Sequence, residues 1–126
     1  MASKAILSGD APEPIGPYSQ GIIAGNTLYV SGQIATDRSR GTLVVGDVKE
    51  ETGQVMKNLG YVLNAAGFEF SNVVKCTIFL KNMGDFPQVN EVYGSFFKEN
   101  APARETVEVA RLPKDVNVEI SCIAVR

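Results

Sequence analysis

Few side chains in this chain can do acid–base chemistry near neutral pH, because the sequence contains no histidine. This absence excludes a histidine general base, a Ser-His-Asp triad, a Cys-His dyad and histidine metal ligands. Glu119 is the carboxylate of most interest, since it lies in the middle of the apolar, strand-like segment 116–125. A carboxylate partly removed from water can position or deprotonate a water molecule. A solvated carboxylate near the end of a sheet fits the same pattern.

Arg104 is a second candidate, and it follows Pro102 and Ala103 at the start of an expected strand. Its planar guanidinium can bind a carboxylate through two parallel hydrogen bonds, although an ordinary surface arginine also fits this position. In an antiparallel hairpin, the beginning of the first strand lies opposite the end of the second. If the last two strands form such a hairpin, Arg104 and Glu119 are expected to line one cavity.

Further polar groups and a glycine lie beside other expected elements. Tyr18 stands just before a strand, where it either lines a site or plugs a turn. Ser31 and Gly32 end the next strand, where they offer a hydroxyl group and room for close approach of the backbone. Asn90 lies on an expected helix, where a solvated amide is the simplest interpretation.

The composition argues against several classes of site and partner. There is no GxGxxG or GxxxxGK[ST] loop, no CxxC zinc spacing and no acidic cluster, so we expect neither a metal nor a cofactor. The 12 basic and 14 acidic residues give a net charge of -2, which does not indicate a nucleic-acid partner. No apolar run has the length of a membrane span or of a signal peptide, which predicts a cytoplasmic protein without membrane contact. Cys76 and Cys122 are expected to be buried thiols, and a disulfide between them is the alternative.

The hydrophobic pattern predicts the elements that position these residues. The length of 126 residues indicates a single domain over 1–126. Alternation of apolar residues predicts strands, and spacings of three and four predict helices. The expected strands are 19–24, 27–31, 73–81, 106–110 and 116–125, and the expected helices are 47–66 and 86–99.

The order of these elements predicts an α+β fold, with a single mixed sheet and two helices packed on one face. We expect the last two strands to form a closing hairpin around a turn at 113–115. The other face of the sheet would carry Phe79, Ile123, Val125 and one of Ile22 or Ile23. Because an apolar face of this size is normally covered, we expect other copies of the chain to cover it in a closed symmetric oligomer.

Seven short segments, taken together and in order, resemble the Rid family of reactive intermediate deaminases, also called the YjgF family. The segments cover nearly the whole chain. They are IGPYSQG at 15–21, SGQI at 31–34, NAAG at 64–67, VNEVY at 89–93, PAR at 102–104, VEVARLPKD at 107–115 and VEI at 118–120.

The resemblance implies a chorismate-mutase-like fold and a homotrimer with clefts between its subunits. It also implies hydrolysis of 2-imino acids, such as 2-iminobutanoate and 2-iminopropanoate, to 2-oxo acids and ammonia. Such imines form from enamines like 2-aminoacrylate. An imine is already electrophilic, so a bound carboxylate and a placed water can suffice without a cofactor.

The resemblance also implies roles for individual residues. Arg104 would bind the substrate carboxylate, and Glu119 would orient the attacking water and help to move protons. Tyr18 would line the cleft from a neighbouring subunit. The positions that would shape or contact the cleft are Ser31, Gly32 and Asn90, with Thr106 near the substrate carboxylate.

Glu105 departs from the family pattern, which commonly has Ser or Thr after Pro-Ala-Arg. A carboxylate there could compete for the Arg104 guanidinium, or it could point away along the strand. Competition would favour a second function, a non-catalytic module that binds 2-oxo acids or similar carboxylates. A third function, ribonuclease or translation-inhibitor activity, has little support from a chain with negative net charge and no histidine.

Overall fold

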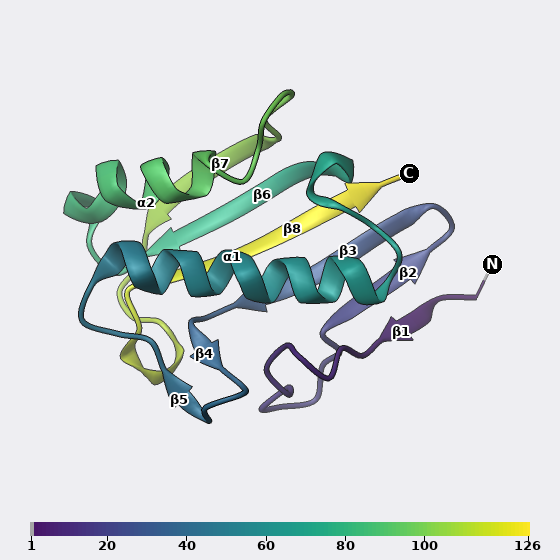
Figure 1. Cartoon of the computed structure of the whole chain (residues 1–126), viewed down its shortest axis with the longest axis horizontal. Coiled ribbons are helices and arrows are strands. Elements are labelled where there is room, and N and C mark those ends of the chain that lie inside the picture. The colour runs from purple at the N-terminus through teal and green to yellow at the C-terminus, as the bar shows by residue number, and fades with distance from the viewer. Residues whose placement is uncertain (1) are drawn as a thin grey trace.

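Strands with alternating buried and exposed residues build a six-stranded sheet in the computed structural model, which describes residues 2–126 (Figure 1). The strand order is β1-β2-β3-β8-β6-β7. All neighbours are antiparallel except β6 and β7, so the sheet is mixed. The strands are β1 (Lys4–Ile6), β2 (Gly21–Ala24), β3 (Thr27–Gln33), β6 (Val73–Leu80), β7 (Ala103–Glu108) and β8 (Val118–Val125), and a separate small pair is formed by β4 (Thr36–Asp37) and β5 (Thr42–Leu43).

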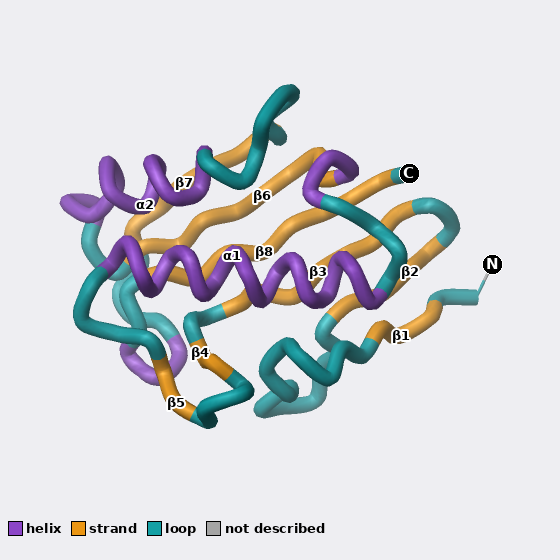
Figure 2. Tube along the Cα trace, in the orientation of Figure 1, coloured by secondary structure: helices purple, strands orange, loops and turns teal. Residues whose placement is uncertain are grey.

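Two α-helices, α1 (Val48–Ala65) and α2 (Phe86–Gly94), lie across the same face of the sheet (Figure 2). The Asp47 carboxylate caps α1 by accepting a hydrogen bond from the Lys49 amide at 2.8 Å. After α1 the chain turns at Gly67, whose φ of 78° suits a residue without a side chain. Three short 3₁₀ turns complete the fold: η1 (Phe70–Asn72), η2 (Met83–Asp85) and η3 (Pro113–Asp115).

The core lies between the helices and the sheet. Alternate residues of β8 point into it, namely Val118, Ile120, Cys122 and Ala124, and all are buried. Cys76 of β6 is the direct neighbour of Cys122, and both are free, buried thiols. The prediction of an α+β sheet with two helices on one face is therefore confirmed, and Cys76 and Cys122 are buried thiols as expected.

The predicted closing hairpin is wrong. β7 pairs with β6 in parallel, and β6 lies between β7 and β8. The segment from β6 through α2 to β7 is a crossover unit, whose helix packs on the sheet and returns the chain parallel to β6. The turn at 113–115 therefore connects two strands that are not neighbours.

Several predicted boundaries also differ from the structure. α2 ends at Gly94 rather than at 99, and Phe96 and Phe97 instead pack on Phe70, with ring centroids 5.3 and 5.7 Å away. Burial of these rings outside the helix explains why helical spacing overestimated its length. β1 and the small pair of β4 and β5 lie outside the strands expected from the sequence.

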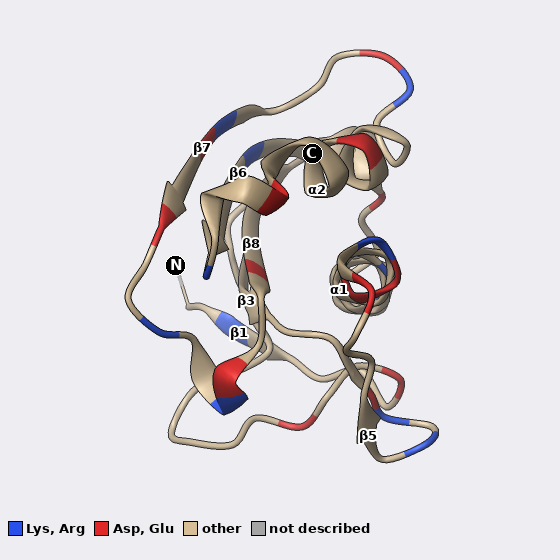
Figure 3. Cartoon of the chain, turned by 90° about the vertical axis from the view of Figure 1, so that its left-hand side faces the viewer, with Lys and Arg blue, Asp and Glu red and all other residues tan. Residues whose placement is uncertain are grey.

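The face of the sheet away from the helices carries no α-helix among residues 2–126 (Figure 3). Ile22, Tyr29 and Ile123 are cross-strand neighbours on this face, and Tyr29 is half exposed. Phe79 lies beside Glu119 on the same face. The predicted apolar face is therefore present in the single chain, with Ile22 as its member from β2.

Candidate active site

Gly32 brings the backbone of β3 directly against the carboxylate of Glu119 on β8. The pairing of β3 with β8 is irregular between Val30 and Gln33, so Gly32 lies in a β-bulge. A Cβ atom at position 32 would collide with Glu119 Oε2. A side chain at position 32 would force the Glu119 carboxylate to move, so glycine permits this close approach, and the bulge directs the backbone toward the carboxylate.

Glu119 lies in a cleft of about 340 Å³. The walls of this Glu119 cleft come from the N-terminal loop, the end of β3 and the turn before β8. They are formed by Ile15, Tyr18, Ser31, Gly32, Ile34, Pro113 and Glu119. Ser31 and Gly32 are therefore brought together with Glu119, as predicted. Tyr18 lines the same cleft from within the same chain, whereas the resemblance implied that it would come from a neighbouring subunit.

The Glu119 carboxylate is half-buried, and burial raises its pKa above the usual range of a glutamate. Among residues 2–126 it has neither an ion pair nor a hydrogen-bond donor. Its oxygens are therefore available to a water molecule or a ligand in the cleft.

The other polar groups of the Glu119 cleft are held by local hydrogen bonds. The Ser31 hydroxyl donates to the Ser19 carbonyl at 2.5 Å, and the Ser31 amide donates to Gln20 O at 2.9 Å. The Tyr18 hydroxyl accepts from the Ile15 amide at 3.3 Å, which folds the loop around its ring. Tyr18 is nevertheless half exposed, so it can contact a ligand.

Arg104 lies on the opposite face of the sheet, beneath α2. Its Nη1 donates to Asn90 Oδ1 at 2.7 Å. Its guanidinium carbon is 5.5 Å from the ring centroid of Phe86 and 5.0 Å from that of Tyr93, so the cation rests on two aromatic rings. We call Arg104, Asn90, Phe86, Tyr93 and Thr106 the Arg104 cluster.

Two buried polar atoms of the Arg104 cluster, the hydroxyl oxygens of Tyr93 and Thr106, have no hydrogen-bond partner within residues 2–126. Burial raises the pKa of the Tyr93 hydroxyl, which therefore stays protonated. Both oxygens are enclosed by the protein, so they are unmet polar groups beside Arg104 and not contacts offered directly to a ligand.

Glu105 does not compete for Arg104. Because successive residues of β7 point to opposite faces, its carboxylate lies on the open face of the sheet. There it accepts from Thr77 Oγ1 at 2.7 Å and pairs with Lys75 Nζ at 3.0 Å. The Thr77 hydrogen bond and the Lys75 charge lower the pKa of the Glu105 carboxyl. The competition considered from the sequence is therefore contradicted.

The expectation that Arg104 and Glu119 share one cavity of the single chain is also wrong. Arg104 is the neighbour of Cys76, whose side chain points into the core, whereas Glu119 is the neighbour of Phe79 on the open face. The two groups thus point to opposite sides of one sheet. The chain therefore carries two separate candidate sites, the Glu119 cleft and the Arg104 cluster, and each contains residues predicted from the sequence.

The sequence analysis missed residues that shape the Glu119 cleft and the Arg104 cluster. Phe86 and Tyr93 belong to the apolar stripe of α2, and that pattern does not distinguish a ring under Arg104 from a core residue. Ile15 and Pro113 lie within the family-like segments but carry no polar group that would single them out. Glu51 was also missed, and its role is to fix the start of β8.

Glu51 lies in the first turn of α1 and is completely buried. Its carboxylate accepts hydrogen bonds from the backbone N–H and the side-chain Nδ2 of Asn117, both at 2.8 Å, and from the backbone N–H of Val118 at 3.2 Å. Three donors satisfy a buried charge that has no cationic partner here. They also fasten α1 to the residues immediately before Glu119.

Within residues 2–126, no group of three or more His, Cys, Asp or Glu side chains is arranged to hold a metal ion. Neither helix of the described part of the chain has both the length and the apolar character that crossing a bilayer requires.

The structure defines an α+β protein with a cation on aromatic rings at Arg104 and an unpaired, half-buried carboxylate at Glu119 among residues 2–126. The sequence profile of the family described as Endoribonuclease L-PSP matches residues 8–126. The chain is 48% identical to the human protein named 2-iminobutanoate/2-iminopropanoate deaminase over 126 residues, which cover 100% of this chain and 92% of the human protein.

Two solved structures from E. coli share this fold. The YjgF gene product has a TM-score of 0.93 and 45% identity, with 98% of each chain covered. TdcF with bound serine has a TM-score of 0.93 and 40% identity, again with 98% of each chain covered. The chain therefore belongs to the Rid/YjgF family, which also carries the names RutC and endoribonuclease L-PSP.

Proposed function

We propose that this protein is a 2-iminobutanoate/2-iminopropanoate deaminase, which hydrolyses 2-imino acids to 2-oxo acids and ammonia. The observation that carries the proposal is the pair of half-sites: a half-buried carboxylate free to hold water, and an arginine presented on aromatic rings. The human relative, about half identical over the full length, is named for this activity.

In this proposal, the two half-sites come from neighbouring copies of the chain in a homotrimer. Arg104 and Glu119 lie on opposite faces of one sheet, so one chain alone cannot place both groups around a small substrate. The apolar open face supports such an assembly, since burying it would bring a second chain beside Glu119. Glu119 and Tyr18 then come from one copy and Arg104 from the next.

Arg104 binds the substrate carboxylate through its guanidinium, which Asn90 and the Phe86 ring hold in place. Thr106 lies on the same face of β7 as Arg104, so it flanks the position proposed for the substrate carboxylate. Holding the carboxylate fixes the imine carbon relative to the water at Glu119, which replaces a chance encounter by a positioned one. Ser31, Gly32 and Tyr18 form the wall that limits where the water and the imine can lie.

Glu119 moves the protons. Its carboxylate takes a proton from the water as the water oxygen bonds to the carbon of the protonated imine, and the π electrons move onto nitrogen to give a neutral carbinolamine. Glu119 then passes this proton to the nitrogen. The carbon–nitrogen bond breaks with its electron pair leaving on ammonia, and the hydroxyl proton passes to solvent as the 2-oxo group forms. Burial raises the pKa of Glu119, so its protonated form is more favoured here than for an ordinary glutamate.

The alternative of a non-catalytic module that binds 2-oxo acids loses its motivation, because Glu105 faces away from Arg104. Ribonuclease activity would need a basic surface, but acidic and basic residues are dispersed along the chain (Figure 3).

The test is an imine-hydrolysis assay with the purified protein. A threonine dehydratase generates the enamine of 2-iminobutanoate, and semicarbazide traps the imine that remains. We expect the protein to lower the yield of the semicarbazone adduct and to increase the rate at which 2-oxobutanoate appears. An unchanged semicarbazone yield with a folded, oligomeric protein would contradict the proposed function.

A further inference from the structure

A second pocket, of about 230 Å³, adjoins the Glu119 cleft. The two share four lining residues, Ile15, Tyr18, Gly32 and Ile34, so they lie on either side of the same wall. The second pocket is also lined by Glu13, Arg38 and Lys114, among others. We call it the Arg38 pocket. None of the steps proposed above uses it.

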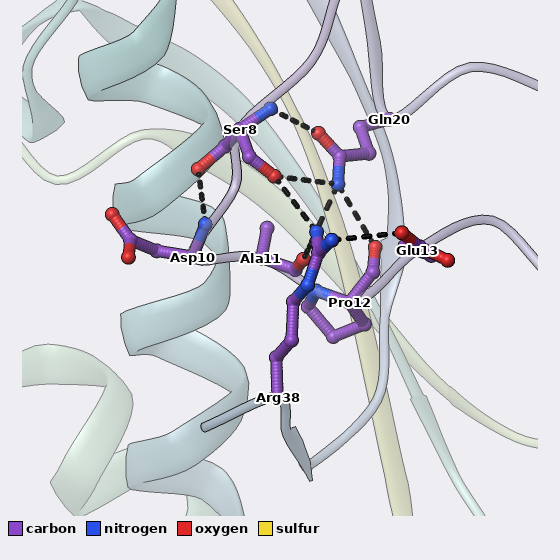
Figure 4. Close-up of polar contacts among 7 residues, drawn as sticks. All are labelled: Ser8, Asp10, Ala11, Pro12, Glu13, Gln20 and Arg38. Atoms are coloured by element: carbon purple, nitrogen blue, oxygen red, sulfur yellow. Dashed lines mark hydrogen bonds and ion pairs between the residues drawn. The ribbon is translucent and has the colours of Figure 1, made fainter. Parts of the chain in front are cut away.

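Arg38 is held rigidly at this pocket by the N-terminal loop (Figure 4). Its Nη1 donates to the carbonyls of Ser8 at 3.2 Å and Ala11 at 2.9 Å. The buried Gln20 fixes those same carbonyls by donating to Ser8 O at 3.2 Å, to Ala11 O at 3.4 Å and to Pro12 O at 2.9 Å. One edge of the guanidinium is therefore anchored, and the cation is preorganised for an anion at its other edge.

The other edge of Arg38 faces Glu13, which Nη2 contacts at 2.8 Å. The Glu13 side chain is 74% exposed, whereas that of Arg38 is 32% exposed. An ion pair with one partner so exposed contributes little to the stability of the protein, because water competes for the carboxylate. A ligand carboxylate could therefore replace Glu13 on an arginine that is already in position.

Lys114 adds a second positive charge to the Arg38 pocket. It lies in η3 with a φ of 55°, and it makes no ion pair within residues 2–126. Pro113, the residue before it, lines the Glu119 cleft. Two cations against the one carboxylate of Glu13 leave the pocket with a net positive charge, which favours an anionic group.

We propose that the Arg38 pocket is a subsite for a second carboxylate, located on the side chain of the substrate. This inference rests on the proposed function, in which the reacting carbon lies at Glu119. Because the two pockets adjoin along shared lining residues, a side chain that extends from the Glu119 cleft along Tyr18 and Gly32 would enter the Arg38 pocket. The substrate class is therefore extended to imino acids of dicarboxylic amino acids, such as 2-iminosuccinate and 2-iminoglutarate.

The experiment measures binding of stable 2-oxo acids by calorimetry, so it does not depend on turnover. The dissociation constants of 2-oxoglutarate and 2-oxobutanoate are measured for the parent and for three variants. Arg38→Gln removes the proposed contact, Glu13→Gln removes the competing carboxylate, and Arg40→Gln removes a nearby arginine that does not line the pocket. The readout is the ratio of the two constants for each protein.

For Arg38→Gln, we expect 2-oxoglutarate binding to weaken about tenfold relative to 2-oxobutanoate, the size of one charge-assisted hydrogen bond. Glu13→Gln is expected to strengthen 2-oxoglutarate binding severalfold, because the arginine is then free, and Arg40→Gln should leave the ratio unchanged. A purely structural role of Arg38 would weaken both ligands equally, and that result would overturn the proposal.

A ratio that neither Arg38→Gln nor Glu13→Gln changes would also overturn it, as would a parent that binds 2-oxobutanoate but not 2-oxoglutarate. Failure of the proposed function is distinguished separately, by a parent that binds these acids but does not accelerate imine hydrolysis.

Discussion

At the scale of single residues, the environment of Glu119 determines what it can do. The side chain is half-buried, touches Gly32 and has no cation or hydrogen-bond donor within residues 2–126. Burial without a compensating partner destabilises the charged form and raises the pKa. A group of this kind can accept and return a proton, which imine hydrolysis requires.

The pH dependence of activity should follow this raised pKa. Glu119 must be ionised to take a proton from water, so kcat/KM is expected to fall as the pH drops through a value above the usual range of glutamate. Glu119→Gln should lower kcat on the order of 10²-fold or more and abolish the acidic limb of the profile. An acidic limb that persists in Glu119→Gln would assign it to another group.

The same shift predicts a gain in stability for Glu119→Gln. A carboxyl whose pKa is raised by folding stabilises the folded state at pH values below its unfolded pKa, and this contribution is lost as the pH rises through its folded pKa. At neutral pH the buried charge is therefore unfavourable, and the glutamine should raise Tm. The thermal unfolding of both proteins checks this at pH 7 and at pH 4, where the difference should be smaller.

Arg104 and Glu105 are adjacent in sequence and lie on opposite faces of β7, so a substitution at Glu105 is a matched control for one at Arg104. We expect Arg104→Ala to lower kcat/KM on the order of 10² to 10³-fold, because the carboxylate of the substrate loses its cation. Glu105→Gln should remain close to the parent. Steady-state kinetics with 2-iminobutanoate test both, and a large loss in Glu105→Gln alone would reverse the assignment.

At the scale of elements, the bulge in β3 and the first turn of α1 hold the cleft in shape. The bulge places Gly32 against Glu119, and Glu51 fastens α1 to the start of β8. The bulge and the Glu51 hydrogen bonds together fix the position of Glu119 along the sheet, since Glu119 follows directly after the residues that Glu51 binds.

Gly32→Ala is expected to displace the Glu119 carboxylate, because a Cβ atom has no room there. The activity should fall at least about tenfold while the fold persists, since small misplacements at a reacting centre are costly. Gly53→Ala is the control, because a Cβ on Gly53 meets nothing within 4 Å. It should keep activity and gain about 0.5–1 kcal/mol from helix propensity. Equal activity of the two variants would show that Gly32 does not position Glu119.

Glu51→Gln should destabilise the protein by about 2–4 kcal/mol, because an amide cannot accept from all three donors at β8. Glu50→Gln, at an exposed neighbouring position, should change the free energy of unfolding by less than about 0.5 kcal/mol. Urea denaturation of both variants measures the difference, and equal stability would mean that the Glu51 hydrogen bonds contribute nothing net.

At the scale of the whole molecule, Arg104 and Glu119 lie on opposite faces of a sheet whose open face is apolar. The proposed homotrimer would cover this face and would join Glu119 of one copy with Arg104 of the next.

The sequence predicted the local features well and the topology poorly. Alternation in 116–125 placed Glu119 opposite the core face, and spacing in 47–66 placed α1, because both patterns are local. The pairing of β7 with β6 depends on a crossover through α2, which no local pattern records. The hairpin assumption therefore failed and put Arg104 and Glu119 into one cavity. The contacts of Glu51 and Arg38, which reach across 66 and 27 positions, were beyond such reasoning for the same reason.

The most direct test of an active site shared between copies is complementation of two inactive variants. Arg104→Ala and Glu119→Ala are each assayed alone, then mixed in equal amounts, unfolded and refolded together. Random assembly of neighbouring copies should restore about a quarter of the parental activity, because one site in four pairs an intact Arg104 with an intact Glu119. A mixture that stays as inactive as the two variants alone would contradict a site built from two chains.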